Sequence, residues 1–167
     1  MNNLHAHRIP ALATVLAGVV VFAATAGCGD AAGPEDLGDA AATYDCDSET
    51  RDDAFFAGMA KTGAAGVEVV VVESTPAPPG RGDNTFILDL VDDAGDAMAD
   101  ATFELRPFMP DHNHGTGIRS EVTPDAEVPG RYAVAPVNLW MPGFWEVNVE
   151  ITAPTADALV FRFCISG

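Results

Sequence analysis

The feature that most constrains the fold is a series of short segments in which apolar residues recur at every second position. The clearest segment is 144–152, where aromatic and β-branched residues alternate with glutamate and asparagine. A period of two places the apolar side chains on one face of a β-strand. Six further segments carry strand-like patterns: 67–73, 85–91, 101–108, 118–123, 131–139 and 159–165.

Aspartate, glycine and proline residues occupy the connections between these segments, as is typical of turns. Seven short strands joined in this way predict an all-β fold, a single antiparallel β-sandwich of immunoglobulin-like type. The segment 118–123 is short and polar, which is typical of an edge strand. Pro136 lacks a backbone N–H and therefore requires a sheet edge or a bulge.

A short helix is expected ahead of the strands, over Thr50–Lys61. Its first residue can cap it, acidic side chains occupy its first turn, and Gly63 follows its last turn. Phe55, Phe56 and Met59 would then form the buried stripe of this helix.

Residues 1–27 have the pattern of a signal peptide. A weakly positive start precedes an apolar run over 11–24, which is shorter than the ~20 residues that a membrane-spanning helix needs. Two cleavage sites compete. The sequence A-T-A fits ordinary signal peptidase, and cleavage after Ala26 would release a secreted protein. The overlapping A-G-C fits a bacterial lipoprotein signal, which lipidates Cys28.

The three cysteines favour the lipoprotein. Cys46 and Cys164 lie at the two ends of the remaining domain, where they can form a disulfide. Cys164 is out of phase with Phe161 and Phe163, so its sulfur faces outward or toward a sheet edge that the chain around Cys46 can cross. Cys28 would then be an odd thiol in an oxidising compartment, and lipidation explains it. Two reactive thiols are the disfavoured alternative, because no C-x-x-C motif is present.

Residues 28–45 are rich in alanine, glycine and aspartate and predict a flexible acidic tether, so the folded domain spans 46–167. The chain has a formal net charge of −17. Such a surface repels phosphate backbones and anionic headgroups, which argues against nucleic-acid partners and against membrane contact other than through the lipid anchor. We therefore expect an extracytoplasmic protein anchored to a bacterial membrane.

Both histidines that remain after the leader lie in the segment 107–115, P-F-M-P-D-H-N-H-G. His112 and His114 flank one residue, so in extended backbone both rings project from the same side. Met109 precedes them, and a thioether with imidazoles is a ligand set that suits copper. Asp111 can add a carboxylate or cap the turn. The alternative is a proline-bounded surface turn whose histidines are only solvated.

A second Met-Pro pair occurs in the segment 139–145, L-W-M-P-G-F-W. If successive strands run alternately up and down, this turn, the histidine segment and the proline-rich loop 75–84 emerge at the same end of the sandwich. The candidate copper ligands are then Met109, His112, His114 and Met141. Cu(I) suits this set better than zinc does, because thioethers are poor zinc ligands.

The ordered combination M-P-x-H-x-H-G, then G-R-Y at 130–132, then L-x-M-P-G-x-W-x-V resembles the YtkA-like domain family. The resemblance covers about residues 84–167. The matching positions are Met109, Pro110, His112, His114, Gly115, Met141, Pro142, Gly143 and Trp145. The family consists of small extracytoplasmic immunoglobulin-like modules, similar in outline to FixH-type proteins associated with copper-oxidase assembly. The resemblance implies this fold and a membrane protein or copper protein as partner.

Two functions remain open. The first is a module that holds or delivers copper outside the cytoplasm. The second is a non-catalytic interaction domain that docks on a membrane or respiratory complex without metal, through an edge strand or the same loop end. An enzyme is not expected, because no nucleophile with a paired base is evident and neither G-x-S-x-G nor H-E-x-x-H occurs.

Overall fold

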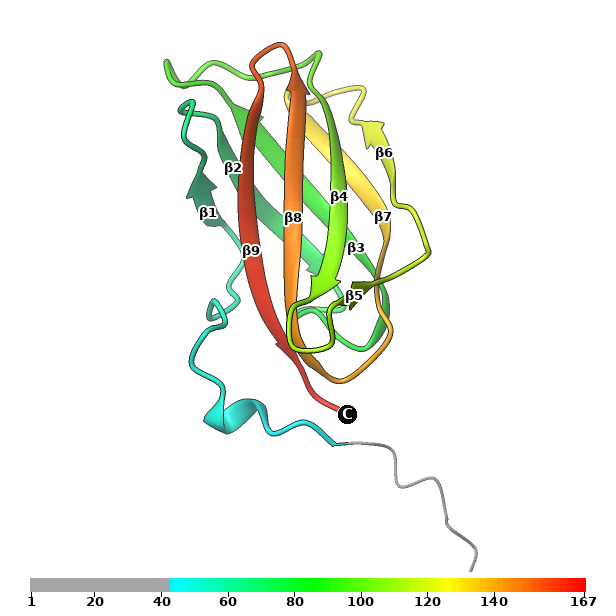
Figure 1. Cartoon of the computed structure of the whole chain (residues 1–167). Coiled ribbons are helices and arrows are strands. Elements are labelled where there is room, and N and C mark those ends of the chain that lie inside the picture. The colour runs from blue at the N-terminus through cyan, green and yellow to red at the C-terminus, as the bar shows by residue number, and fades with distance from the viewer. Residues whose placement is uncertain (1–42) are drawn as a thin grey trace, which may run out of the picture. The chain divides into compact units, whose positions relative to one another are not determined.

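The computed structural model describes residues 43–167, which form two antiparallel β-sheets packed face to face (Figure 1). The prediction of an all-β sandwich is confirmed. The predicted signal peptide, Cys28 and most of the predicted tether lie outside the described residues. Within the described part of the chain, no helix is long and apolar enough to cross a membrane.

The described residues contain nine strands. The larger sheet has the order β1-β2-β3-β7-β6, with the bounds Met59–Thr62, Glu68–Thr75, Gly82–Val91, Arg131–Leu139 and Glu121–Pro124. The smaller sheet has the order β5-β4-β8-β9, with the bounds His114–Gly115, Thr102–Met109, Gly143–Ala153 and Asp157–Ile165. Each of the seven predicted segments contains or overlaps a strand, β6 is at an edge as expected, and β1 and β5 are additional.

The core lies between the two sheets, and the alternating pattern of the sequence builds it. In β8, Trp145, Val147 and Val149 are fully buried, whereas Glu150 is exposed. Burial of a side chain of this kind stabilises the fold by about 1.5–3 kcal/mol. The period of two in the sequence therefore identifies the inward face correctly.

β7 lies inside the larger sheet, between β3 and β6. The pairing of β3 with β7 shifts within the strand, since Asn84 is opposite Val137 but Phe86 is opposite Val134. Pro136 is therefore at a bulge, which was one of the two positions that its missing N–H allows.

The helix predicted over Thr50–Lys61 is not formed, and that prediction is wrong. The helical element of the described residues is a short 3-10 turn, η1, over Cys46–Ser48, and Met59–Thr62 forms β1 against β2. Residues 49–58, which we call the strap, run beside β9 (Figure 1). Phe56, expected to be buried, is 61% exposed.

The strap is extended because its polar and aromatic groups find partners on β9. The Asp53 N–H donates to the carbonyl of Arg162 at 2.8 Å, and the Arg162 N–H donates to the Asp53 carboxylate at 2.8 Å. The ring of Phe55 packs edge-on against Phe163, with centroids 6.3 Å apart. These contacts cover the edge of β9 and outweigh a weak local preference for helix.

The predicted disulfide between Cys46 and Cys164 is present and joins residues that are 118 positions apart. The alternation of β9 explains its position. Phe163 and Ile165 are buried, so the side chain between them points away from the core. The disulfide fixes η1 to β9 directly ahead of the strap.

Candidate functional site

The two histidines lie in a tight turn that joins β4 to β5, the histidine loop (residues 110–115). β5 folds back on β4, with His114 opposite Met109. The His112 N–H donates to the Met109 carbonyl at 3.2 Å and closes the turn. A Cβ added at Gly115 would lie 2.5 Å from a backbone oxygen of β4, so only glycine permits this close return.

The turn places the two imidazoles side by side. The ring centroids of His112 and His114 are 5.6 Å apart, with the ring planes at 84°. His112 is exposed and His114 is half-buried. Nδ1 of His114 lies 3.2 Å from the carbonyl oxygen of Gly115. In the tautomer that carries its proton on Nδ1, this nitrogen donates to that oxygen and Nε2 keeps a lone pair for a ligand.

The second Met-Pro turn, between β7 and β8, contacts the histidine loop. The indole of Trp140 stacks on the ring of His114, with centroids 5.7 Å apart and planes at 26°, and Trp140 is 46% exposed. Arg81, in the proline-rich loop, donates from Nε to the Trp140 carbonyl at 3.0 Å. The three connections therefore meet at one end of the sandwich, as predicted, and the two Met-Pro turns are seen there in Figure 1.

The two methionines differ in burial. Met109 is fully buried and belongs to the hydrophobic core cluster. Met141 is only partly buried against that cluster, and its carbonyl accepts a hydrogen bond from the Trp145 indole at 2.9 Å. A Cβ at Gly143 would lie 2.6 Å from Cε of Met109, so the second turn rests directly on this side chain.

Sequence reasoning missed Arg51, which reaches from the strap to the histidine loop. Its Nη1 and Nη2 donate to the two oxygens of Asp111, each at 2.7 Å, and its Nε donates to Glu49 at 2.9 Å. These hydrogen bonds hold the pKa values of the Asp111 and Glu49 carboxyls below their ordinary range. The guanidinium carbon also lies 4.1 Å from the centroid of the Phe144 ring.

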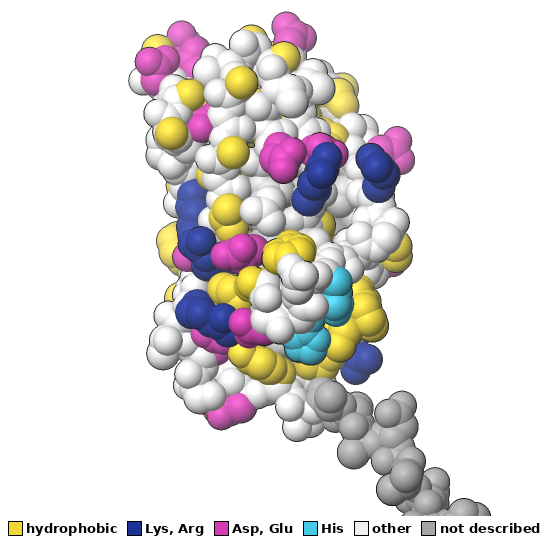
Figure 2. Space-filling model, viewed as in Figure 1, with side chains coloured by type: hydrophobic (Ala, Val, Ile, Leu, Met, Phe, Trp, Pro, Cys, Tyr) yellow, Lys and Arg dark blue, Asp and Glu magenta, His cyan; other side chains and the backbone are white. Residues whose placement is uncertain are grey.

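The carboxylate of Asp111, considered above as a metal ligand or a cap of the turn, is thus bound by Arg51. Residues 43–167 contain no group of three or more histidine, cysteine, aspartate and glutamate side chains arranged to hold a metal ion. Figure 2 shows the histidines (cyan) at the surface, bordered by hydrophobic side chains and close to basic and acidic ones. Arg51 and Asp111 are 60 positions apart, and no local pattern in the sequence indicates their pairing.

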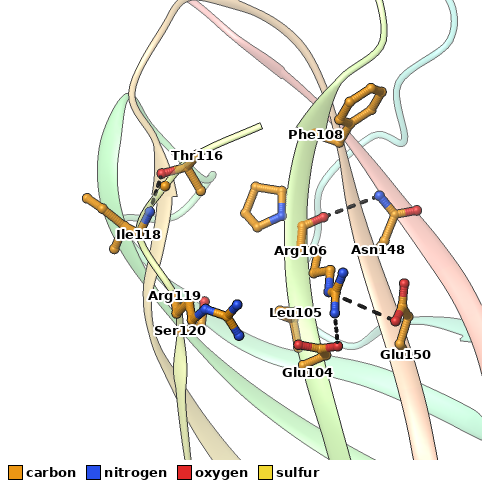
Figure 3. Close-up of a pocket in the computed structure, with 12 residues that line it drawn as sticks. Glu104, Leu105, Arg106, Phe108, Thr116, Ile118, Arg119, Ser120, Asn148 and Glu150 are labelled. Atoms are coloured by element: carbon orange, nitrogen blue, oxygen red, sulfur yellow. Dashed lines mark hydrogen bonds and ion pairs between the residues drawn. The ribbon is translucent and has the colours of Figure 1, made fainter. Parts of the chain in front are cut away.

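A second candidate region is the free edge of β4. β5 pairs with β4 only at Phe108 and Met109, so the edge of β4 over 102–107 has no strand partner among the described residues. A groove of about 490 Å³ lies between β4 and the connection Thr116–Ser120 (Figure 3). Ile118 on this connection is exposed.

The charges of this groove are largely paired. Arg106 contacts Glu104 and lies 3.9 Å from Glu150. Arg119, on the opposite wall in Figure 3, has no ion pair with any residue that the structure describes. The groove therefore offers an unpaired strand edge with one free guanidinium beside it.

The sequence model of the YtkA-like family matches residues 61–150, which is more than half of the chain. The match begins earlier and ends earlier than the motifs alone indicated, and it leaves both disulfide cysteines outside. No curated protein and no solved structure matches the chain significantly. The histidine loop and the second Met-Pro turn both lie within the matched residues. The chain belongs to the YtkA-like family, and the domain is an extracytoplasmic module of that kind.

Proposed function

We propose that this domain binds one copper ion outside the cytoplasm through His112 and His114, as a carrier held at a membrane by a lipidated Cys28. Release as a secreted protein after cleavage at Ala26 is the alternative to the anchor. The observation that supports copper binding is the pair of imidazoles, 5.6 Å apart, at the end where two Met-Pro turns meet.

The donor set fits copper. A histidine that binds metal through one ring nitrogen commonly donates from the other to a carbonyl or carboxylate, and the contact of His114 with the Gly115 carbonyl has this form. Stacking on Trp140 restricts the orientation of the same ring. Two neutral imidazoles suit Cu(I) and Cu(II), and a thioether as a third ligand shifts the preference toward Cu(I).

Met141 is the better placed of the two thioethers to be that third ligand, because its side chain is only partly buried. Met109 is fully buried, and moving it out of the core to reach an ion would cost about 1.5–3 kcal/mol of hydrophobic burial. We therefore assign Met109 to the support of the loop, and it becomes a ligand only if the histidine loop opens.

The experiment is a titration of the purified domain with Cu(I) against a competing chromophoric ligand. We expect one ion per domain, and loss of binding when His112→Ala and His114→Ala are combined. Asn113→Gly is the matched control, since residue 113 lies between the histidines with a positive φ of 54° that glycine also adopts. Full binding by the double variant would overturn the proposal.

The free edge of β4 favours a second candidate function, a docking module. An extended segment of a partner protein can add to an unpaired strand edge through main-chain hydrogen bonds. Capture of a membrane or respiratory complex by metal-free domain should then be lost in Ile118→Asp and kept in the histidine variants. Val128→Asp, at another exposed position, is the control. Capture that survives Ile118→Asp would exclude this groove.

A further inference from the structure

Arg51 is held firmly in position at the edge of the candidate metal site. On one side the chain is fixed by the Cys46–Cys164 disulfide, and on the other by the hydrogen bonds between Asp53 and Arg162. The guanidinium lies over the Phe144 ring and is further held by Glu49. The strap and β8 thus supply contacts to this guanidinium besides those of the histidine loop.

From this position Arg51 binds both oxygens of Asp111. The two hydrogen bonds, each 2.7 Å, form a bidentate arginine–carboxylate pair, which is among the stronger side-chain interactions. Asp111 directly precedes His112. The only carboxylate within the histidine loop is therefore occupied by the strap.

A free carboxylate beside two imidazoles would change the metal preference of the site. Zn²⁺ and Cu²⁺ accept carboxylate oxygens together with imidazoles, whereas Cu(I) favours nitrogen and sulfur ligands. If Zn²⁺ or Cu²⁺ bound the carboxylate of Asp111, the charge-assisted pair between Asp111 and Arg51 would have to break. Cu(I) bound by imidazoles and a thioether would leave that pair intact.

We propose that Arg51 is a specificity-determining residue: by holding Asp111, it withholds the oxygen ligand of the histidine loop and disfavours Zn²⁺ and Cu²⁺ relative to Cu(I). This inference rests on the proposed binding of a metal ion by His112 and His114. The strap lies outside the residues matched by the family, whereas Asp111 lies within them. The proposed selectivity thus depends on a segment outside the matched residues.

The test is a calorimetric Zn²⁺ titration of wild type, Arg51→Gln, and Arg51→Gln combined with Asp111→Asn. Mutation of a residue that holds a metal ligand typically changes metal affinity by roughly 10–100-fold, so Arg51→Gln should bind Zn²⁺ at least ~10-fold more tightly than wild type. The combined variant should return to the wild-type affinity. Arg106→Gln is the charge-matched control, because it frees a carboxylate of β4 instead.

Two further variants keep the result interpretable. Arg51→Lys retains the charge but cannot form the bidentate pair, so its gain in Zn²⁺ affinity should be smaller than that of Arg51→Gln. This comparison separates the loss of the pair with Asp111 from a general loosening of the strap. Adding His112→Ala and His114→Ala to Arg51→Gln should abolish the gain. Thermal melts of the metal-free variants show whether each domain is folded.

An unchanged Zn²⁺ affinity in folded Arg51→Gln, or a gain that persists when Asp111→Asn is added, would overturn the inference. A Cu(I) titration of the same proteins separates this outcome from failure of the proposed function. If wild type binds Cu(I) and the Zn²⁺ gain is absent, only the role of Arg51 is wrong. If wild type binds no Cu(I), the copper proposal is wrong whatever Arg51→Gln does.

Discussion

The imidazole of His114 lies against the indole of Trp140, with ring centroids 5.7 Å apart and planes at 26°. The two residues belong to connections at opposite ends of the sequence motif, β4–β5 and β7–β8. Their contact joins the histidine loop to the second Met-Pro turn. It also places an exposed tryptophan beside the proposed copper ligands.

This contact predicts an optical signal. Cu(I) bound at His114 should quench the emission of Trp140, and the quenching should saturate at one equivalent. The other tryptophan, Trp145, is fully buried and should report little change. Trp140→Phe should remove the signal while Cu(I) binding persists in the competition assay. Quenching of the same size in Trp140→Phe would place the ion elsewhere.

The disulfide should contribute a large part of the stability. Closing a loop of 118 residues is worth roughly 4–5 kcal/mol in the chain-entropy model, which approaches the whole stability of a small domain. Reduction, or Cys46→Ser with Cys164→Ser, should lower the melting temperature by roughly 10 °C or more in calorimetry. Reductant should not shift the melt of the double variant. An unchanged melt of reduced wild type would refute this role.

Tyr132 should be a stabilising residue of the core. Its buried hydroxyl donates to the Met98 carbonyl at 2.6 Å and accepts from the Ala101 N–H at 2.9 Å. Tyr132→Phe leaves both backbone groups without this partner and should lower the free energy of unfolding by about 1–3 kcal/mol in urea denaturation. Tyr44→Phe, whose hydroxyl donates to the Glu49 carboxylate in a contact that is only partly buried, is the control and should cost less.

Asp157 should make the stability depend on acid pH. Burial acts to raise the pKa of its carboxyl, but hydrogen bonds from the backbone N–H groups of Ala65, Ala158 and Val67 lower it below the ordinary value of 3.8. A carboxyl whose pKa is lower in the folded state than in the unfolded state stabilises the fold at pH values above its unfolded pKa. This contribution is lost as the pH falls below about 3.8.

Asp157→Asn should therefore flatten the acid limb of a stability-versus-pH curve measured by urea denaturation. Asp100→Asn, at an exposed position in the β3–β4 connection, removes a carboxyl that accepts no hydrogen bond among the described residues and serves as the control. Equal flattening in both variants would show that Asp157 has no special part in the acid dependence.

The strands were predictable from sequence because their information is local. Alternation identified the inward face of β8 and β9 and, through Cys164, the direction of the disulfide. The strap was not predictable in the same way. Phe55 and Asp53 take their conformation from Phe163 and Arg162, which lie more than a hundred positions away in sequence, so a local helix signal was misleading.

The candidate site was predictable in its position but not in its details. The alternating direction of successive strands predicted that the two Met-Pro turns lie at the same end, and the contact between His114 and Trp140 confirms this. The sequence pattern does indicate the burial of Met109, because this residue is in phase with Phe103 and Leu105 on the inward face of β4. The role of Arg51 could not be predicted, because its pairing with Asp111 depends on how the strap runs along β9.

X-ray absorption spectroscopy of the Cu(I)-loaded domain shows directly whether His112 and His114 bind copper together. We predict scattering from two imidazole nitrogens at about 2 Å, with a sulfur contribution that is lost in Met141→Leu. The imidazole scattering should be absent when His112→Ala and His114→Ala are combined. A spectrum of the wild-type domain without imidazole scattering would show that these histidines do not bind the ion.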